Sequence, residues 1–143
     1  MIRASIVRSP IDVGAIRADV AGPSNGAIAL FLGTVRAEND GRDVDGIEYS
    51  AYDEMAVSEM TAILEEARAS FGVADAVVEH RLGELAVGEV SIAVAVAAPH
   101  RAAAFDAVQF IVNETKRRAP VWKLEHYADG TREWVGAARE AVA

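Results

Sequence analysis

Cysteine is absent from the 143 residues of this sequence. Its absence excludes disulfide bonds, metal sites built on thiolates and any persulfide carried by the chain itself. Long apolar runs are missing as well, because the longest, around Ile92–Ala98, has the length of a strand rather than of a membrane span. Residues 1–5 lack the charged and then apolar layout of a signal peptide, so we expect a cytoplasmic protein that does not enter a membrane.

Positive charge is in short supply, with 14 Lys and Arg residues against 22 Asp and Glu and a net charge of -8. This acidity argues against general nucleic-acid binding, which requires a basic surface, but it leaves room for a small basic site. Apolar residues make up 52% of the chain and charged residues 25%, a globular balance. We therefore expect one domain over residues 1–143, with a core of its own and no structural metal.

Hydrophobic periodicity divides the chain into strands and helices, without repeats or linkers. Strands are predicted over residues 2–7, 27–35, 46–51, 74–82, 89–97, 121–127 and 132–135, and helices over residues 10–20, 53–71 and 100–118. The first helix is expected to have Ser9 as its N-cap and Pro10 at its first position. Gly72 is expected to end the second helix, and Pro120 the third.

Two segments carry more specific expectations. The run 27–35 is apolar almost throughout, so we expect a strand buried on both faces. Residues 37–45 are polar and contain glycine, which favours a mobile loop. The order of the elements predicts an α+β fold with a mixed or largely antiparallel sheet and two long helices. This architecture alone predicts no function.

Lysine is used sparingly, at positions 116 and 123 only, whereas the chain has twelve arginines. A lysine amine, unlike a guanidinium, can lose its proton when partly buried and then act as base, acid or nucleophile. Lys116 and Lys123 are therefore candidate catalytic residues. The alternative is that coding bias left two lysines on the surface, with Lys116 merely favourable at a helix C-terminus. The residues alone leave both interpretations open.

Three further cations stand where an anion could dock. His100 and Arg101 begin the predicted helix 100–118, where the helix dipole disfavours cations unless an anion binds between them and the free N–H groups. Arg36 closes the predicted strand 27–35, so it either faces a cleft or is the first exposed residue of a loop. Solvated side chains remain the alternative for all three.

The run 116–123 joins a basic helix end to a proline, a tryptophan and the second lysine. A basic patch with an aromatic residue can bind nucleic acid, but its shortness and the acidity of the chain favour a small anionic ligand. His80 and His126 are interpreted as structural or surface residues. No spacing of His, Asp and Glu predicts a metal site.

Five ordered fragments resemble one family. They are Phe31-x-Gly33-x-Val35-Arg36, Glu48-Tyr49 with Tyr52, His80-Arg81-x-Gly83-x-Leu85-x-x-Gly88-Glu89, His100-Arg101-x-x-x-Phe105 and Lys116-x-Arg118-Ala119-Pro120-x-Trp122-Lys123-x-Glu125. Together, over about residues 26–134, they are similar to the catalytic subunits of molybdopterin synthase, the MoaE family. The resemblance implies an α/β-hammerhead-like fold and no cofactor. It also implies sulfur transfer to cyclic pyranopterin monophosphate from the C-terminal Gly-Gly thiocarboxylate of a small β-grasp partner.

The resemblance also implies roles for residues and an assembly. Lys116 would be the principal catalytic lysine, and Lys123 would assist and contact the pterin. The substrate-binding residues it implies are Arg36, His100, Arg101, Thr34, Val35, Leu124 and Glu125. Thr34 and Leu124 replace basic residues of the family, so the contact expected from these two is through the backbone. The family is a dimer of this subunit with one partner at each outer end, a heterotetramer.

Two other functions fit the residues. A non-catalytic regulatory module would use Arg36, His100 and Arg101 to sense a phosphorylated metabolite and would tolerate Lys116→Arg. A docking scaffold for a ubiquitin-like protein would form the complex without making product.

Overall fold

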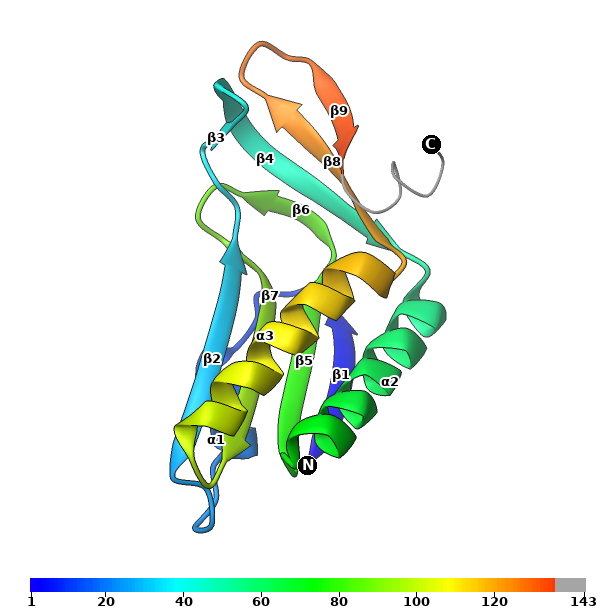
Figure 1. The fold of residues 1–143 in the computed structure, drawn as a ribbon. Coiled ribbons are helices and arrows are strands. Elements are labelled where there is room, and N and C mark those ends of the chain that lie inside the picture. The colour runs from blue at the N-terminus through cyan, green and yellow to red at the C-terminus, as the bar shows by residue number, and fades with distance from the viewer. Residues whose placement is uncertain (136–143) are drawn as a thin grey trace.

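A four-stranded sheet forms the body of the molecule in the computed structural model, which describes residues 1–135 (Figure 1). Its strands, in spatial order, are β1 (Ile2–Val7), β5 (Asp75–Arg81), β7 (Val90–Ala98) and β2 (Ala27–Thr34). β1 and β5 run parallel, and the other two pairs are antiparallel. The sheet is therefore mixed, as the sequence predicts, and β2 is one of its edges.

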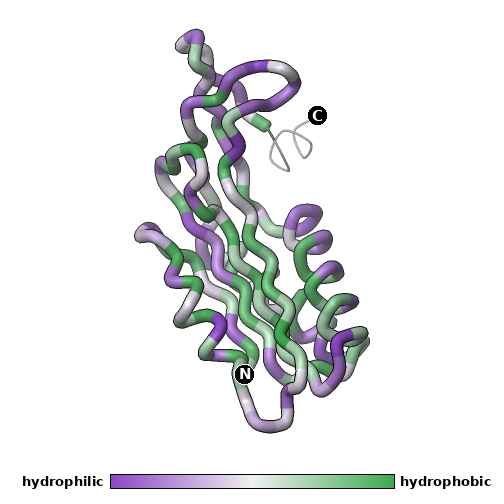
Figure 2. Tube along the Cα trace, turned by 90° about the vertical axis from the view of Figure 1, so that its left-hand side faces the viewer, coloured by the Kyte–Doolittle hydropathy of each residue, from purple (hydrophilic) through white to green (hydrophobic). Residues whose placement is uncertain are grey.

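Two long helices, α2 (Asp53–Phe71) and α3 (Arg101–Arg118), cover one face of this sheet (Figure 1). The main core lies between them and the sheet, where Met60, Leu64 and Ile111 are fully buried against Val78 and Val94. Alternate side chains of the same strands point to the opposite face, which the short α1 (Val13–Val20) partly covers. Figure 2 shows the resulting concentration of hydrophobic residues along the central strands.

A second sheet continues from one end of the first. It contains β3 (Glu38–Asn39), β4 (Arg42–Ala51), β8 (Val121–Tyr127) and β9 (Arg132–Val135) in that order, and β6 (Gly83–Ala86) also pairs with β4. Its own small core consists of Val35, Val44, Ile47, Leu85 and Tyr127. A Cβ at Gly46 would lie 2.8 Å from the carbonyl oxygen of Leu85, so the close pairing of β4 with β6 requires glycine there.

Both long helices end as the sequence predicts. Gly72 takes a left-handed conformation (φ 69°) and donates its N–H to Arg68, and α3 ends two residues before Pro120. The predicted start of α1 is wrong. The carboxylate of Asp12, rather than Ser9, accepts the N–H of Ala15 (3.0 Å), and the helix begins after Pro10, at Val13.

Two other expectations are wrong, and β6 was not expected at all. β2 is an edge strand, and its side chains Ile28, Leu30 and Leu32 are 37–41% exposed rather than buried on both faces. Residues 37–45 are not a loop but contain β3 and the start of β4. Asp40 and Gly41 connect these strands with positive φ angles of 51° and 75°, which suit a tight hairpin turn.

Across residues 1–135, none of the helices combines the length and the apolar character that crossing a membrane would require.

Arg118 ties the end of α3 to α2. Its Nε donates to Glu59 (2.8 Å), and both terminal nitrogens donate to the two carboxylate oxygens of Glu66 (2.8 and 2.7 Å). Glu114, one turn earlier on α3, lies 3.5 Å away. We expect Arg118→Ala to lower the melting temperature by roughly 3–6 °C, because this partly buried, bidentate network joins two helices.

The control for this prediction is Arg68→Ala, since the Arg68 guanidinium pairs with Glu65 on its own helix and with no second element among residues 1–135. It should change the melting temperature by about 1 °C or less. The hydrogen bond from Arg118 holds the pKa of Glu66 below its ordinary 4.5. The stabilisation is therefore present above that pH and is lost as the pH falls through the lowered value. The difference in melting temperature between wild type and Arg118→Ala should become smaller in acid. Equal losses of melting temperature in Arg118→Ala and Arg68→Ala would contradict this role of Arg118.

Candidate functional site

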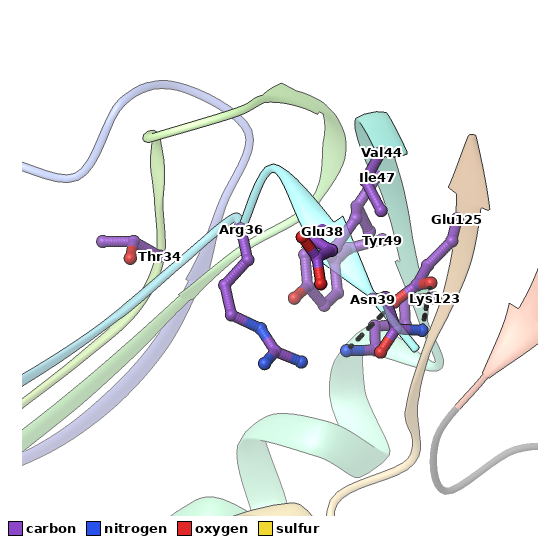
Figure 3. A pocket seen from close by; sticks show the side chains of 9 residues that line it. All are labelled: Thr34, Arg36, Glu38, Asn39, Val44, Ile47, Tyr49, Lys123 and Glu125. Atoms are coloured by element: carbon purple, nitrogen blue, oxygen red, sulfur yellow. Dashed lines mark hydrogen bonds and ion pairs between the residues drawn. The ribbon is translucent and has the colours of Figure 1, made fainter. Parts of the chain in front are cut away.

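A small pocket, open to solvent, lies where the end of β2 meets the second sheet (Figure 3). Its lining residues are Thr34, Arg36, Glu38, Asn39, Val44, Ile47, Tyr49, Lys123 and Glu125. Figure 3 shows Arg36 on one side and Lys123 with Glu125 on the other, with Glu38 and Tyr49 between them. The pocket thus brings two cations and two carboxylates together around a tyrosine.

The pairing of β4 with β8 places four of these side chains on one face. Ile47 is opposite Glu125, and Tyr49 is opposite Lys123. Because side chains of a strand alternate between the two faces of a sheet, both pairs point to the same side. Leu124, between the two β8 residues, points to the other face.

Glu125 is a buried carboxylate, with 3% of the residue exposed. Its Oε2 accepts hydrogen bonds from the Asn39 side-chain amide (2.7 Å) and the Tyr127 hydroxyl (2.6 Å). Its Oε1 lies 3.8 Å from Nζ of Lys123, whose side chain is 33% exposed. The hydrogen bond to Glu125 raises the pKa of Tyr127 above its ordinary 10. A phenol that keeps its proton can serve Glu125 as a permanent donor.

The other side of the pocket holds a cation that has no counter-ion in the described part of the chain. Arg36 is exposed and makes no hydrogen bond or ion pair with any residue in the range 1–135. Tyr49, on the floor, has its pKa raised by burial, against the opposing effect of a hydrogen bond with Ser91. A neutral phenol and an unpaired guanidinium are suited to binding an anionic ligand through charge and hydrogen bonds.

The pocket brings together four of the predicted site residues, Thr34, Arg36, Lys123 and Glu125. Val35 does not reach it. Its side chain is buried in the core of the second sheet, and its backbone is hydrogen-bonded to Glu89 and Gly88.

Lys116 lies outside the pocket lining, in the last turn of α3, which leads through Ala119 into β8. It is exposed and has no ion pair or hydrogen bond within the described part of the chain. His100 and Arg101 are at the opposite end of the same helix. Lys116 is fifteen positions after Arg101 on this helix, about 22 Å away at 1.5 Å per residue. One copy of the chain therefore does not assemble all the predicted residues in one place.

Sequence reasoning missed five lining residues, namely Glu38, Asn39, Val44, Ile47 and Tyr49. Tyr49 and Ile47 had a usable signal, since they alternate along a predicted strand. Asn39 also had one, because Asp40-Gly41 is a dipeptide typical of hairpin turns, and a hairpin would have brought Asn39 back onto the sheet. No group of three or more His, Asp or Glu side chains suited to a metal ion occurs within residues 1–135.

His80 supports the floor of the pocket from behind. Its ring meets the Tyr49 ring edge to face at 5.0 Å, and its Nδ1 donates to the carbonyl oxygen of Arg81 (2.9 Å). Burial lowers the pKa of His80 from 6.5 to about 4, so the imidazole is neutral at physiological pH. It is therefore a packed structural residue, as the sequence predicts.

The lowered pKa of His80 makes stability fall in mild acid. The unfolded chain binds a proton below pH 6.5, whereas the folded chain does so only near 4. Stability that is complete above pH 6.5 is therefore lost as the pH falls toward 4, by about 2 kcal/mol between pH 7.5 and 5. Urea unfolding at the two pH values should show this loss in wild type and a loss smaller by that amount in His80→Gln. An equal loss in both proteins would mean that His80 does not contribute it.

The fold and the pocket define a class, an acidic α+β protein with a small pocket that brings Arg36 and Lys123 together. Comparison with known proteins makes this specific. The family model described as MoaE protein matches residues 6–118, so the chain belongs to the MoaE family. The molybdopterin synthase catalytic subunit of Pyrococcus abyssi is 48% identical over 130 residues, which cover 90% of this chain and 88% of that one.

Solved structures agree with this assignment. The crystal structure of molybdopterin synthase from Staphylococcus aureus superimposes with a TM-score of 0.88 at 30% identity, over 92% of this chain and 96% of that one. A complex of subunits 1 and 2 of the molybdopterin-converting factor of Helicobacter pylori contains a chain with a TM-score of 0.76. At 20% identity, over 92% of this chain and 89% of that one, this last likeness concerns the fold.

Proposed function

We propose that this chain transfers sulfur to cyclic pyranopterin monophosphate from the C-terminal thiocarboxylate of a small β-grasp carrier. The observation that carries the proposal is the pocket, in which Arg36, without an ion-pair partner among residues 1–135, faces Lys123 across a neutral tyrosine. A thiocarboxylate and a phosphate are both anions, so bringing them together requires positive charge fixed in advance. Arg36 and Lys123 supply that charge in a chain that is otherwise acidic.

The chain has to receive its sulfur from another molecule, since it contains no cysteine that could carry a persulfide. The thiocarboxylate sulfur bonds to a carbon of the substrate and displaces an oxygen substituent from it. Water then hydrolyses the acyl–sulfur bond, so that the sulfur stays on the substrate and the carrier leaves as a carboxylate. Lys116 is suited to act at the carrier's carbonyl group, because its amine is exposed and unpaired, within the described residues, beside the entry to β8.

The small carrier is proposed as the partner of this chain in the same way. The Helicobacter pylori structure is a complex of two subunits, and one of them shares the fold of this chain. An extended carrier tail would have to reach both Lys116, in the last turn of α3, and the pocket, to which the following strand β8 contributes Lys123 and Glu125. The exposed Tyr52, in edge-to-face contact with Trp122 at 5.0 Å, offers an apolar surface beside that segment.

A dimer is proposed because β2 leaves both an unpaired edge and an apolar stripe. Among the described strands, β2 pairs only with β7, and Ile28, Leu30 and Leu32 are exposed beside it. Two such edges that pair antiparallel about a two-fold axis form one continuous sheet and place the two stripes side by side on one face, where neighbouring side chains bury part of each other.

The same symmetry would complete the site. Ala27, at the start of β2, pairs with Ala98, only two residues before His100. Arg36 follows the other end of β2. Antiparallel pairing brings the end of one β2 to the start of the other, so His100 and Arg101 of one copy would approach Arg36 of its partner. The two groups of cations that stand apart within one chain would then belong to a shared pocket.

The test of the proposed function mixes the purified chain with cyclic pyranopterin monophosphate and a thiocarboxylated carrier. Molybdopterin, detected as its fluorescent oxidised derivative, is the expected product. A carrier that ends in an ordinary carboxylate is the matched control and should give none. Binding of both carriers without any product would overturn the catalytic proposal in favour of a docking scaffold. Binding of the phosphorylated substrate alone, without carrier binding, would favour the regulatory module.

A further inference from the structure

Asn39, in the short strand β3, has a side chain that reaches Glu125, 86 positions further along the chain. It is half-buried in the pocket lining. Its amide nitrogen donates to Oε2 of Glu125 (2.7 Å) and lies 3.4 Å from the Tyr127 hydroxyl, which donates to the same oxygen. Both donors therefore converge on one oxygen of a buried carboxylate.

This convergence makes the two oxygens of Glu125 unequal. Oε2 has two donors, whereas Oε1 has neither of them and is the oxygen that lies 3.8 Å from Nζ of Lys123. A buried carboxylate without donors would be costly and free to rotate. With Oε2 fixed, the remaining oxygen is directed to the lysine at the pocket wall.

We propose that Asn39 is a positioning residue for the reaction, which fixes the carboxylate of Glu125 so that its free oxygen holds the Lys123 ammonium toward the pocket. The inference rests on the proposed function for its catalytic consequence. The link from Asn39 through Glu125 to Lys123 follows from the interatomic distances and does not depend on that function.

The hairpin that carries Asn39 is itself held in place. Arg42, just beyond the turn, donates to Glu133 (2.9 Å) and Thr131 (2.7 Å) on the β8–β9 side. Its guanidinium also lies 3.5 Å over the Tyr127 ring. Asn39 therefore belongs to a rigid connection between β3 and β8, and the position of its amide is set by the fold rather than by a free loop.

Replacing Asn39 with aspartate would turn the hydrogen bond to Glu125 into a repulsion. Asn39→Asp has nearly the same shape, but it places a second carboxylate against Glu125, and the two like charges repel each other. We expect the kcat for product formation to fall about tenfold in Asn39→Ala and about 100-fold in Asn39→Asp at pH 8, because misplacing a reacting group by about 1 Å has effects of that order. Affinity for the carrier should not change.

The pH dependence separates positioning from general damage. Once protonated, the new carboxyl group at position 39 can donate a hydrogen bond again, so Asn39→Asp should regain activity relative to wild type as the pH is lowered toward 6. Within residues 1–135, Lys123 and Tyr127 lie against Glu125, and Tyr49 interacts with it electrostatically; all three are unchanged in this variant. Gln109→Glu, the same change of charge at an exposed site on α3, is the control and should keep wild-type kinetics and pH profile.

A readout that does not require turnover uses the scarcity of lysine. Reductive methylation with a ¹³C label should give lysine NMR signals from Lys116 and Lys123 only. We expect the Lys123 signal to shift in Asn39→Ala and, independently, in Tyr127→Phe, while the Lys116 signal stays. An inactive wild type would overturn the proposed function but leave this test intact. Unchanged Lys123 signals in both folded variants, or a uniform loss of activity at every pH, would overturn the positioning role.

Discussion

Replacing Lys116 with alanine is expected to remove product formation by a factor of about 1000 or more, the range that general acid–base or nucleophilic groups contribute. Because its side chain is exposed and unpaired within residues 1–135, the melting temperature should change by about 1 °C or less. Single-turnover assays with thiocarboxylated carrier measure the first quantity, and thermal unfolding measures the second.

Lys116→Arg separates charge from chemistry at the same position. The guanidinium keeps the positive charge but cannot give up its proton, so we expect turnover to stay near that of the alanine variant. Arg117→Ala is the control. Arg117 is the next residue, is also exposed, and pairs within α3 with Glu114 (2.6 Å), so this variant should be close to wild type in activity. An active Lys116→Arg would assign the lysine a purely electrostatic role and favour an anion-binding module over the proposed chemistry.

The long elements could be predicted from the sequence because local chemistry specifies them. The helix that ends at Gly72 has apolar residues at helical spacing and a residue suited to a left-handed cap. The strand 121–127 is bounded by Pro120 and by the Asp129-Gly130 turn. These signals depend on neighbouring residues, and they need no knowledge of which elements come together.

The position of β2 in the sheet could not be predicted from local signals. An apolar run has the same appearance in a central strand and in an edge strand that waits for a partner. Whether Leu30 is buried depends on the sheet order, which pairs strands from distant parts of the sequence. The sequence therefore predicts a strand in this place, but its burial on both faces is wrong.

Some residues of the site could be predicted from sequence motifs, and others only from the structure. Arg36, Lys123 and Glu125 could be named because they stand in motifs that resemble a family. For Asn39, the Asp40-Gly41 turn signal indicates a place on the sheet but not a role. The roles of Asn39 and Tyr127 come from two donors that meet on one oxygen across a hairpin and a neighbouring strand. A pairwise contact over 86 positions leaves no periodic signal in one sequence.

The second large effect concerns the dimer. Arg101→Ala and Lys116→Ala should each be inactive alone, because each lacks one part of a site, the pocket together with the adjacent Lys116, that two copies share. Mixing them should restore activity. In a mixed dimer, one pocket combines the intact Arg101 of one copy with the intact Lys116 of the other, while the second pocket lacks both. With free exchange in a two-fold dimer, about a quarter of the pockets become complete.

Leu30→Glu tests the interface on which this restoration depends. Leu30 is 41% exposed at the middle of β2, so the charge is tolerated in a single copy but would face its symmetry mate in the paired sheet. We expect this variant to elute as a monomer in size-exclusion chromatography and to lose turnover, although Lys116, Lys123 and Arg36 are unchanged. Glu84→Gln, an exposed change on strand β6, should stay dimeric and active.

The mixing experiment can also contradict the shared site. If Arg101→Ala and Lys116→Ala form mixed dimers that remain inactive, each site belongs to one copy, and His100 and Arg101 serve another purpose.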